Sequence, residues 1–264
     1  MTKAERPIGL FDSGIGGTSI WQEIHALLPH EHCLYLADSR YAPYGEKSPE
    51  EIIKLSVKNT EYLLEQGCKI IVVACNTATT NAIGYLRGNY DVPFIGIEPA
   101  IRPAALNTRN KTIGILATQG TLNSTLFHDA TQSLARDIKV VEVVGKGLVP
   151  LIESGAVTSK ETRLLLKEHL APMTEAQIDY LVLGCSHYPY LIPLIRELIS
   201  PEIVIIDSGE AVARQTKAVL SRNNLLNTAK GAPDLKFLIN AAPDALRSIL
   251  HAHGGRITIS EVDF

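Results

Sequence analysis

The chain has 264 residues, of which 45% are hydrophobic and 20% are charged, and its formal net charge is −3. This composition excludes a disordered chain, and the lack of a basic excess argues against nucleic acid as a partner. Length alone predicts one or two domains. The apolar runs are much shorter than the roughly 20 residues of a membrane helix, so no membrane partner is expected.

Cysteine content and the first residues bear on the compartment. Four cysteines in a chain of this length do not form a disulfide scaffold. No secretory apolar region follows Met1 before the first short strand. We therefore expect a cytoplasmic protein with free thiols.

Short apolar runs rich in Ile, Val and Leu recur along the chain, with amphipathic stretches between them. Such runs, about four to six residues long, are typical of parallel strands covered on both faces. The predicted strands are Ile8–Phe11, Cys33–Leu36, Ile70–Ala74, Phe94–Ile97, Ile113–Ala117, Val140–Val144, Tyr180–Leu183, Ile203–Ile206 and Leu235–Ile239. Strands that alternate with helices predict an α/β fold.

Three helix starts carry clear signals. Ser48–Glu51 combines an N-cap serine, a proline at the first helical position and a glutamate three residues after the cap, and Gly67 is placed to end that helix. Thr158–Glu161 resembles a second capping box. Pro243 is expected to open a C-terminal helix after the last predicted strand.

The chain contains a weak internal repeat. Ile8–Ser13 resembles Ile113–Thr118, and Ile71–Thr77 resembles Leu181–His187, at offsets of 105 and 110 residues. The order and the spacing are nearly kept, and both halves share a strand followed by a cysteine and a hydroxyl. We therefore expect two similar α/β halves with a boundary near Ile97–Pro99.

The repeat brings two cysteines to equivalent places. Cys75 and Cys185 each follow a predicted buried strand, at the strand end where open α/β sheets bind ligands. A helix N-terminus after Cys75 is expected to favour its thiolate. The matched pair is compatible with a redox or metal pair, a hydrolase with His187 as base, or two acid–base groups on opposite faces of one carbon. No C-x-x-C or clustered zinc spacing supports the first of these.

Two polar loops are candidate ligand loops, and several other features are discounted. Asp12–Gly17 and Asp38–Glu46 each follow a strand, although Asp12–Gly17 matches no phosphate-loop pattern and fits a tight strand–helix turn equally well. His30–Cys33 is expected to be solvated surface, His251 and His253 exposed helix-end residues, and Trp21 a packing residue. Cys33 and Cys68 begin strands, so both are expected to be buried structural thiols.

Six motifs in order resemble the glutamate racemases of the aspartate/glutamate racemase family over the whole chain. The motifs are Asp12–Gly17, Asp38–Ser39 with Pro43–Gly45, Ala74–Ala78, Gly96–Ala100, Leu116–Thr118 and Gly184–Pro189. The resemblance implies a cofactor-independent enzyme that makes D-glutamate for peptidoglycan, with no metal. It also implies two similar, pseudo-twofold related α/β domains with mostly parallel sheets facing a central cleft. Residues 1–97 and 209–264 would form the first domain, and residues 98–208 the second.

The resemblance also assigns roles to individual residues. Cys75 would face the α-hydrogen of D-glutamate with Asp12 as its partner, and Cys185 that of L-glutamate with His187 as its partner. Glu153 would orient His187. Besides Asp12 and His187, the substrate-binding residues would be Ser13, Tyr44, Gly45, Asn76, Thr77, Thr118, Thr121 and Ser186. The family usually has threonine where this chain has Ser186, and a homodimer is common in the family.

Three other functions remain open at this stage. A related racemase acting on aspartate, one methylene shorter than glutamate, would need the same two thiols. A Cys/His hydrolase would pass through a covalent acyl-enzyme. A catalytically silent protein of the same fold would bind an amino acid without converting it.

Overall fold

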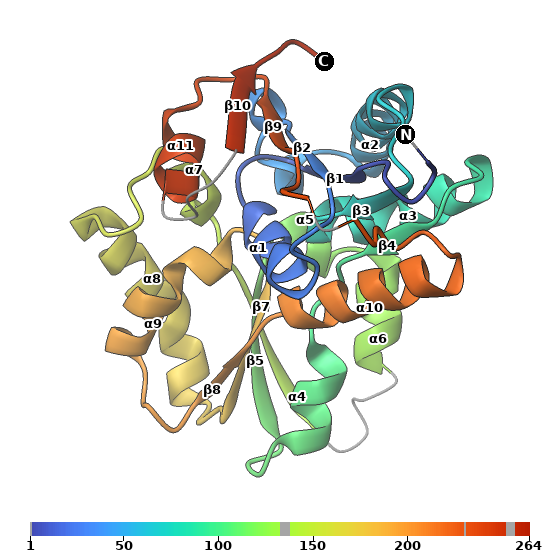
Figure 1. The fold of residues 1–264 in the computed structure, drawn as a ribbon. Coiled ribbons are helices and arrows are strands. Elements are labelled where there is room, and N and C mark those ends of the chain that lie inside the picture. Colours follow the sequence, from blue (N-terminus) through green and yellow to red (C-terminus); the bar gives the residue numbers. More distant parts are fainter. Residues whose placement is uncertain (1, 133–137, 230, 252–256) are drawn as a thin grey trace.

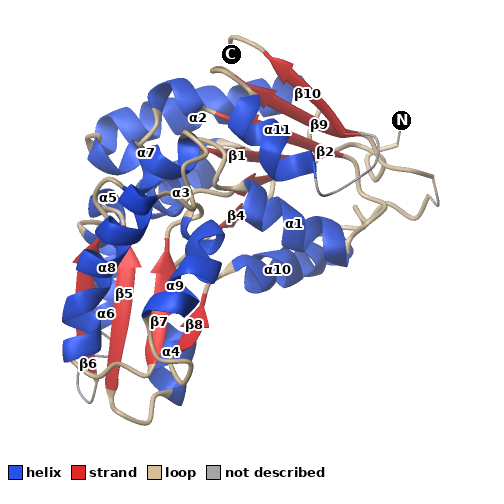
Figure 2. Ribbon diagram, turned by 90° about the vertical axis from the view of Figure 1, so that its left-hand side faces the viewer, coloured by secondary structure: helices blue, strands red, loops and turns tan. Residues whose placement is uncertain are grey.

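The computed structural model describes residues 2–132, 138–229, 231–251 and 257–264, which form two parallel β-sheets surrounded by helices (Figure 1). Figure 2 shows the six-stranded sheet across the top and the four-stranded sheet standing upright below it. Neighbouring strands in both sheets run parallel. The predicted α/β class is confirmed.

The six-stranded sheet has the order β10-β9-β2-β1-β3-β4. Its strands are β1 (Ile8–Asp12), β2 (Cys33–Ala37), β3 (Ile70–Val73), β4 (Phe94–Gly96), β9 (Leu235–Ile239) and β10 (Ile257–Glu261). β1 is buried along its whole length between β2 and β3. Strand β9 pairs with β2, with Leu235 opposite Cys33, so the end of the chain completes the first sheet.

Strand β10 was not predicted from the sequence. Its residues alternate between apolar and polar, and the strand is half exposed at the edge of the sheet beside β9. A short edge strand lacks the continuous apolar run that marks the buried strands.

The four-stranded sheet has the order β6-β5-β7-β8. Its strands are β5 (Thr112–Ala117), β6 (Lys139–Val144), β7 (Tyr180–Gly184) and β8 (Val204–Ile206). β5 and β7 are the central strands and are almost completely buried. All eight strands from β1 to β8 were predicted to within one residue at each end.

The helices follow the strands and cover the sheets. They are α1 (Thr18–Leu27), α2 (Pro49–Glu65), α3 (Asn76–Asn89), α4 (Ile101–Asn107), α5 (Gln119–Leu122), α6 (Thr125–Gln132), α7 (Leu148–Glu153), α8 (Lys160–Glu175), α9 (Ile192–Leu198), α10 (Gly209–Arg222) and α11 (Asp244–Leu250), with 3-10 turns η1 (Ser39–Tyr41), η2 (Tyr44–Glu46) and η3 (Tyr188–Leu191). Helices α1 and α10 pack side by side (Figure 1). Within the described ranges, no helix combines the length and the apolar composition of a membrane-spanning segment.

The three predicted helix starts are confirmed, except that the capping residue of α8 is one position later than predicted. Ser48 caps α2 by accepting a hydrogen bond from the Glu51 N–H at 3.2 Å, and Gly67 follows the helix with φ +77°. In α8 the cap is Ser159, which accepts from the Thr162 N–H at 3.1 Å, rather than Thr158. Pro243 directly precedes α11.

Most of the discounted side chains lie where they were expected. Trp21 is fully buried on α1 and packs its ring edge-on against Phe237, and both Cys33 and Cys68 are buried. His251 is exposed after α11, whereas His253 lies outside the described residues.

The prediction that His30–Cys33 is solvated surface is wrong for one charged residue. Glu31 is buried and forms an ion pair with the equally buried Lys69. It also accepts a hydrogen bond from the Asn227 N–H at 2.8 Å. A distant lysine supplied by the tertiary structure therefore compensates the buried carboxylate.

Candidate active site

Cys75 lies between strand β3 and helix α3 and is the N-cap of the helix. Its Sγ accepts a hydrogen bond from the Ala78 N–H at 3.5 Å and lies 3.7 Å from the Ser13 hydroxyl. The side chain is 4% exposed. Burial and the charge of Asp12 raise the pKa of the Cys75 thiol well above its ordinary value, and they outweigh the N–H at the helix start. The thiolate that the helix terminus was expected to favour is therefore disfavoured in the free protein.

Cys185 occupies the matching place after strand β7. It is also buried, and its Sγ lies 3.8 Å from Nδ1 of His187. The match with Cys75 is incomplete, because the turn Ser186–His187 and the 3-10 turn η3 follow Cys185 instead of a long helix. The next two residues, Ser186 and His187, both contact Asp12, whose charge also acts on Cys75, so one polar network lies beside both thiols.

A chain of polar contacts joins the ends of the two sheets beside these thiols. Asp12, at the end of β1, accepts hydrogen bonds from the Gly14 N–H at 3.0 Å and from the Ser186 hydroxyl at 3.0 Å. Its carboxylate lies 4.0 Å from Nε2 of His187. The carboxyl edges of the two sheets therefore meet at this site, as expected for ligand sites in α/β folds.

Glu153, at the end of α7, holds His187. Its Oε1 lies 2.5 Å from Nε2 of His187, and it also accepts hydrogen bonds from the Ile15 N–H at 2.7 Å and the Ser39 hydroxyl at 2.8 Å. Glu153 therefore contacts His187 as the resemblance implies, and it connects the second sheet to two loops of the first.

Burial and charge act in opposite directions on this group. Burial lowers the pKa of His187, but its hydrogen bonds with Cys185 and Glu153 and the charge of Asp12 outweigh burial, so its pKa lies well above the ordinary value. Burial raises the pKa of Glu153, yet the hydrogen bond and charge of His187 outweigh burial and hold it below the ordinary value. For Asp12, burial outweighs the attraction of His187 and raises the pKa. The favoured state is thus an imidazolium paired with the Glu153 carboxylate.

The glycines of the Asp12–Gly17 loop leave room for this pair. A Cβ on Gly14 would lie 2.0 Å from Oε1 of Glu153, and a Cβ on Gly16 would lie 2.2 Å from Nδ1 of His187. The loop was interpreted as either an anion loop or a tight turn. The structure shows a tight turn. Because Gly14 and Gly16 have no side chains, the turn leaves space for Glu153 and His187.

Three threonine hydroxyls form a cluster between the two sheets. Thr77 lies 2.8 Å from Thr118 and 3.3 Å from Thr121, and Thr118 donates to Thr121 at 3.0 Å. Beside Thr77, the amide of Asn76 is buried, and neither its oxygen nor its nitrogen has a hydrogen-bond partner in the described structure. A buried amide without partners is costly unless a ligand satisfies it.

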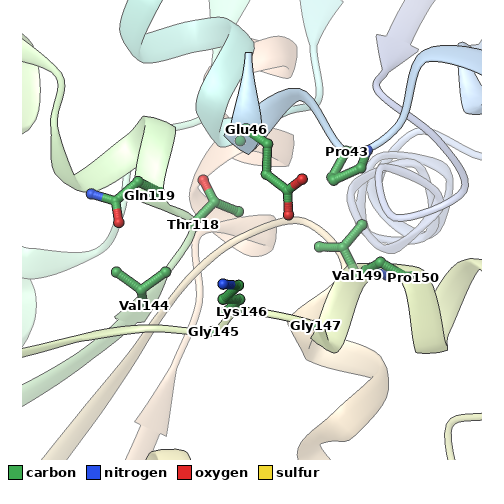
Figure 3. A pocket seen from close by; sticks show the side chains of 11 residues that line it. Pro43, Glu46, Thr118, Gln119, Val144, Gly145, Lys146, Gly147, Val149 and Pro150 are labelled. Carbon is green, nitrogen blue, oxygen red and sulfur yellow. The ribbon is translucent and has the colours of Figure 1, made fainter.

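A cavity of about 340 Å³ opens next to this cluster. It is lined by Pro43, Gly45, Glu46, Thr118, Gln119, Val144, Gly145, Lys146, Gly147, Val149 and Pro150 (Figure 3). Gly45 and Thr118 are the predicted substrate-binding residues that line it. The Tyr44 hydroxyl instead donates a hydrogen bond to the buried carboxylate of Asp38.

Sequence reasoning missed the wall of the cavity that follows β6. Gly145, Lys146 and Gly147 lie directly beyond the carboxyl end of that strand. A glycine-rich turn at that end of a parallel strand could have indicated a ligand-binding loop, but this turn lies outside the repeated segments of the sequence. Within the described ranges, no group of three or more His, Cys, Asp or Glu side chains is placed to hold a metal ion.

Comparison with known proteins agrees with this geometry. Residues 11–216 match the family model described as Asp/Glu/Hydantoin racemase. A glutamate racemase of Herpetosiphon aurantiacus is 44% identical over 90% of this chain and 94% of its own.

Solved structures show the same likeness. The glutamate racemase isoform RacE1 of Bacillus anthracis has a TM-score of 0.88 and 30% identity, covering 99% of this chain and 98% of its own. The Escherichia coli glutamate racemase has a TM-score of 0.86 and 33% identity, covering 97% and 98%. The chain therefore belongs to the Asp/Glu/Hydantoin racemase family and is a racemase, an isomerase, of the glutamate racemase type.

Proposed function

We propose that this enzyme interconverts L- and D-glutamate by proton transfer between the substrate α-carbon and two thiols, Cys75 and Cys185, without a cofactor. The observation that carries the proposal is the pair of buried thiols at matching strand ends, on either side of one polar network. The similar Escherichia coli enzyme was solved in complex with L-glutamate and the activator UDP-MurNAc-ala, which supports glutamate as the substrate.

The charges favour one starting state for the L-enantiomer. Burial and the charge of Asp12 keep Cys75 protonated, and the imidazolium of His187 lies next to Cys185, which we assign as the base for L-glutamate. The Cys185 thiolate removes the α-proton, and the electron pair of the C–H bond moves to the α-carbon and carboxylate. The Cys75 thiol then delivers its proton to the opposite face, which inverts the centre. With D-glutamate the two thiols exchange roles.

The α-hydrogen of an amino acid is a far weaker acid than a thiol, so the developing negative charge needs stabilisation. We assign this role to the amide of Asn76, which has no partner among the described residues, and to the hydroxyl of Thr77. Asp12 and Glu153 keep His187 charged and oriented. On this proposal the product D-glutamate supplies peptidoglycan synthesis in the cytoplasm.

Incubation of purified, cofactor-free protein with L-glutamate in D₂O tests this function. We expect D-glutamate with deuterium at the α-carbon, which chiral chromatography and NMR detect. In a parallel reaction we expect little conversion of L-aspartate. A requirement for added pyridoxal phosphate or metal would contradict the two-thiol mechanism. Accumulation of a covalent acyl-enzyme, detected by mass spectrometry, would instead indicate a hydrolase.

A further inference from the structure

Asn240, the first residue after strand β9, reaches into the loop that follows β2. Its side chain is 2% exposed. The amide nitrogen donates to Oδ1 of Asp38 at 2.6 Å, and the amide oxygen accepts from the Arg40 N–H at 2.9 Å. Both hydrogen-bonding atoms of the amide are therefore used to hold a segment about 200 residues earlier in the chain.

Asp38 is the centre of a buried polar cluster. Its carboxylate is fully buried and forms an ion pair with Lys58 at 2.7 Å. The other oxygen accepts hydrogen bonds from the Tyr44 hydroxyl and from Asn59, the latter at 3.2 Å. Because Lys58 and Asn240 contact one oxygen and Tyr44 and Asn59 the other, the plane of the carboxylate is fixed.

Tyr44 connects the fixed carboxylate of Asp38 to the wall of the cavity. Burial and the charge of Asp38 raise the pKa of the Tyr44 phenol well above its ordinary value, so the hydroxyl stays protonated and donates to Asp38. The next residue, Gly45, lines the cavity, and a Cβ there would lie 2.7 Å from Cβ of Thr118. The cavity wall Pro43–Glu46 is thus seated tightly against the second sheet, so a small displacement changes the cavity.

We propose that Asn240 is a positioning residue for substrate binding, which acts through Asp38 and Tyr44 on the cavity wall Pro43–Glu46. The inference rests on the proposed function, because it assigns glutamate to the space beside this wall. Asn240 itself does not line the cavity. Its loss is therefore expected to change how tightly substrate is held more than how fast the α-proton is transferred.

Two variants of Asn240 test the proposal by showing whether the substitution changes KM more than it changes kcat. Asn240→Leu removes both side-chain hydrogen bonds at similar volume. Asn240→Asp keeps an acceptor for Arg40 and places a second carboxylate against Asp38. We expect either variant to raise KM for both enantiomers about tenfold, the scale of one lost buried hydrogen bond, with kcat changed less than about threefold.

Asn227→Leu is the matched control. Asn227 also uses both amide atoms, donating to the His30 carbonyl at 2.9 Å and accepting from the Ala229 N–H at 3.0 Å. It lies before β9, on the side of the sheet where β2 begins, so its loss should lower thermal stability without moving KM.

The double variant Asn240→Leu with Tyr44→Phe tests the route of the effect. If Asn240 acts through Asp38 and Tyr44, Tyr44→Phe should itself raise KM, and adding Asn240→Leu to it should raise KM further by less than about threefold, a sign of direct coupling. An unchanged KM in both Asn240 variants, or a full tenfold further increase in the double variant, would overturn the positioning role. If wild-type protein does not racemise glutamate, the proposed function fails first, and the inference fails with it.

Discussion

His187 is the side chain on which the charges of the site converge. It lies 3.8 Å from the Cys185 thiol, 2.5 Å from Glu153 and 4.0 Å from Asp12. Burial alone would make the imidazole neutral, but its neighbours reverse this and raise its pKa. Among the residues that the structure describes, Cys75 has no comparable cationic partner, and its pKa is raised by burial and by Asp12. The two thiols at matching strand ends therefore lie in different electrostatic surroundings.

Replacement of either thiol by a hydroxyl should abolish racemisation. A hydroxyl is a much weaker acid, so Cys75→Ser and Cys185→Ser should each lower kcat by about 10³-fold or more while glutamate still binds. Cys185→Ser should still exchange the α-hydrogen of D-glutamate, and Cys75→Ser that of L-glutamate. Chiral assays and NMR in D₂O measure both. Cys33→Ser is the control, because Cys33 is buried at the start of β2, the end of the strand away from the site, and its Sγ contacts the Glu31 carbonyl. A near-wild-type rate in a Cys75 or Cys185 variant would contradict the mechanism.

The substitution Glu153→Gln should move the basic limb of activity to lower pH. Without the carboxylate the imidazolium of His187 is less stable, so its pKa falls and the positive charge beside Cys185 is lost at a lower pH. Both values of kcat/KM must fall together, because the enantiomers have equal free energy. pH–rate profiles and NMR titration of the imidazole measure the shift, and an unchanged basic limb would show that Glu153 does not act through His187.

The same pair makes folding stability depend on pH. The raised pKa of His187 contributes stability below its unfolded pKa, near 6.5, which is lost as pH rises through the folded pKa. The lowered pKa of Glu153 contributes stability above its unfolded pKa, near 4.3, which is lost as pH falls through the folded pKa. Glu153→Gln should therefore destabilise the protein most between about pH 4.3 and 6.5, as measured by urea unfolding at several pH values.

Among the elements, the β1–α1 turn has the strictest steric demand. Gly14 and Gly16 lie against side chains of the second sheet, and a Cβ on Gly17 would lie 2.7 Å from that of Asp12. Glycine is therefore required in this turn because the side chains of Glu153, His187 and Asp12 pack directly against it. By contrast, a Cβ on Gly84 in the middle of α3 would have no described atom within 4 Å apart from its own neighbours and the surrounding helix backbone.

These two environments predict opposite results for the same substitution. Gly16→Ala forces the imidazole of His187 to move, so kcat should fall about 10²-fold or more. Gly84→Ala should leave activity unchanged and stabilise the protein by about 0.5–1 kcal/mol, because alanine favours the helix. Steady-state kinetics and chemical denaturation of both variants provide the comparison. Full activity in Gly16→Ala would mean that His187 need not stay where the turn allows it.

At the scale of the whole molecule, hydrogen bonds across the two sheets surround the site. Besides the contact of Asp12 with Ser186, the Ser19 hydroxyl donates to the Ser186 carbonyl at 2.8 Å, and Thr18 lies 2.5 Å from the Tyr190 hydroxyl. The six-stranded sheet comes from residues 8–96 and 235–261, and the four-stranded sheet from residues 112–206. The division into domains at residues 97 and 208, like the homodimer, stays a prediction.

A ligand held by residues of both sheets should stabilise the whole fold. In the inactive Cys75→Ser variant, either enantiomer of glutamate at about 100 times its Kd should add about 2.7 kcal/mol, which corresponds to about 5–10 °C in Tm. Adding Asn76→Ala should remove most of this shift, because its buried amide is left for a ligand to satisfy. Differential scanning calorimetry measures it. An equal shift in the double variant would place glutamate elsewhere.

The sequence by itself determined the strands β1 to β9, the parallel α/β class and the position of both thiols after buried strands, because these depend on local properties. Buried parallel strands need continuous apolar runs, and the chain repeats one strand–Cys–hydroxyl pattern twice. The resemblance added Asp12, His187 and Glu153. Only the tertiary structure decided the buried Glu31–Lys69 pair, the edge strand β10 and the cavity wall Gly145–Gly147. It also decided the raised pKa values of Cys75 and His187, since pKa values depend on burial and on charges that are brought together from distant parts of the chain.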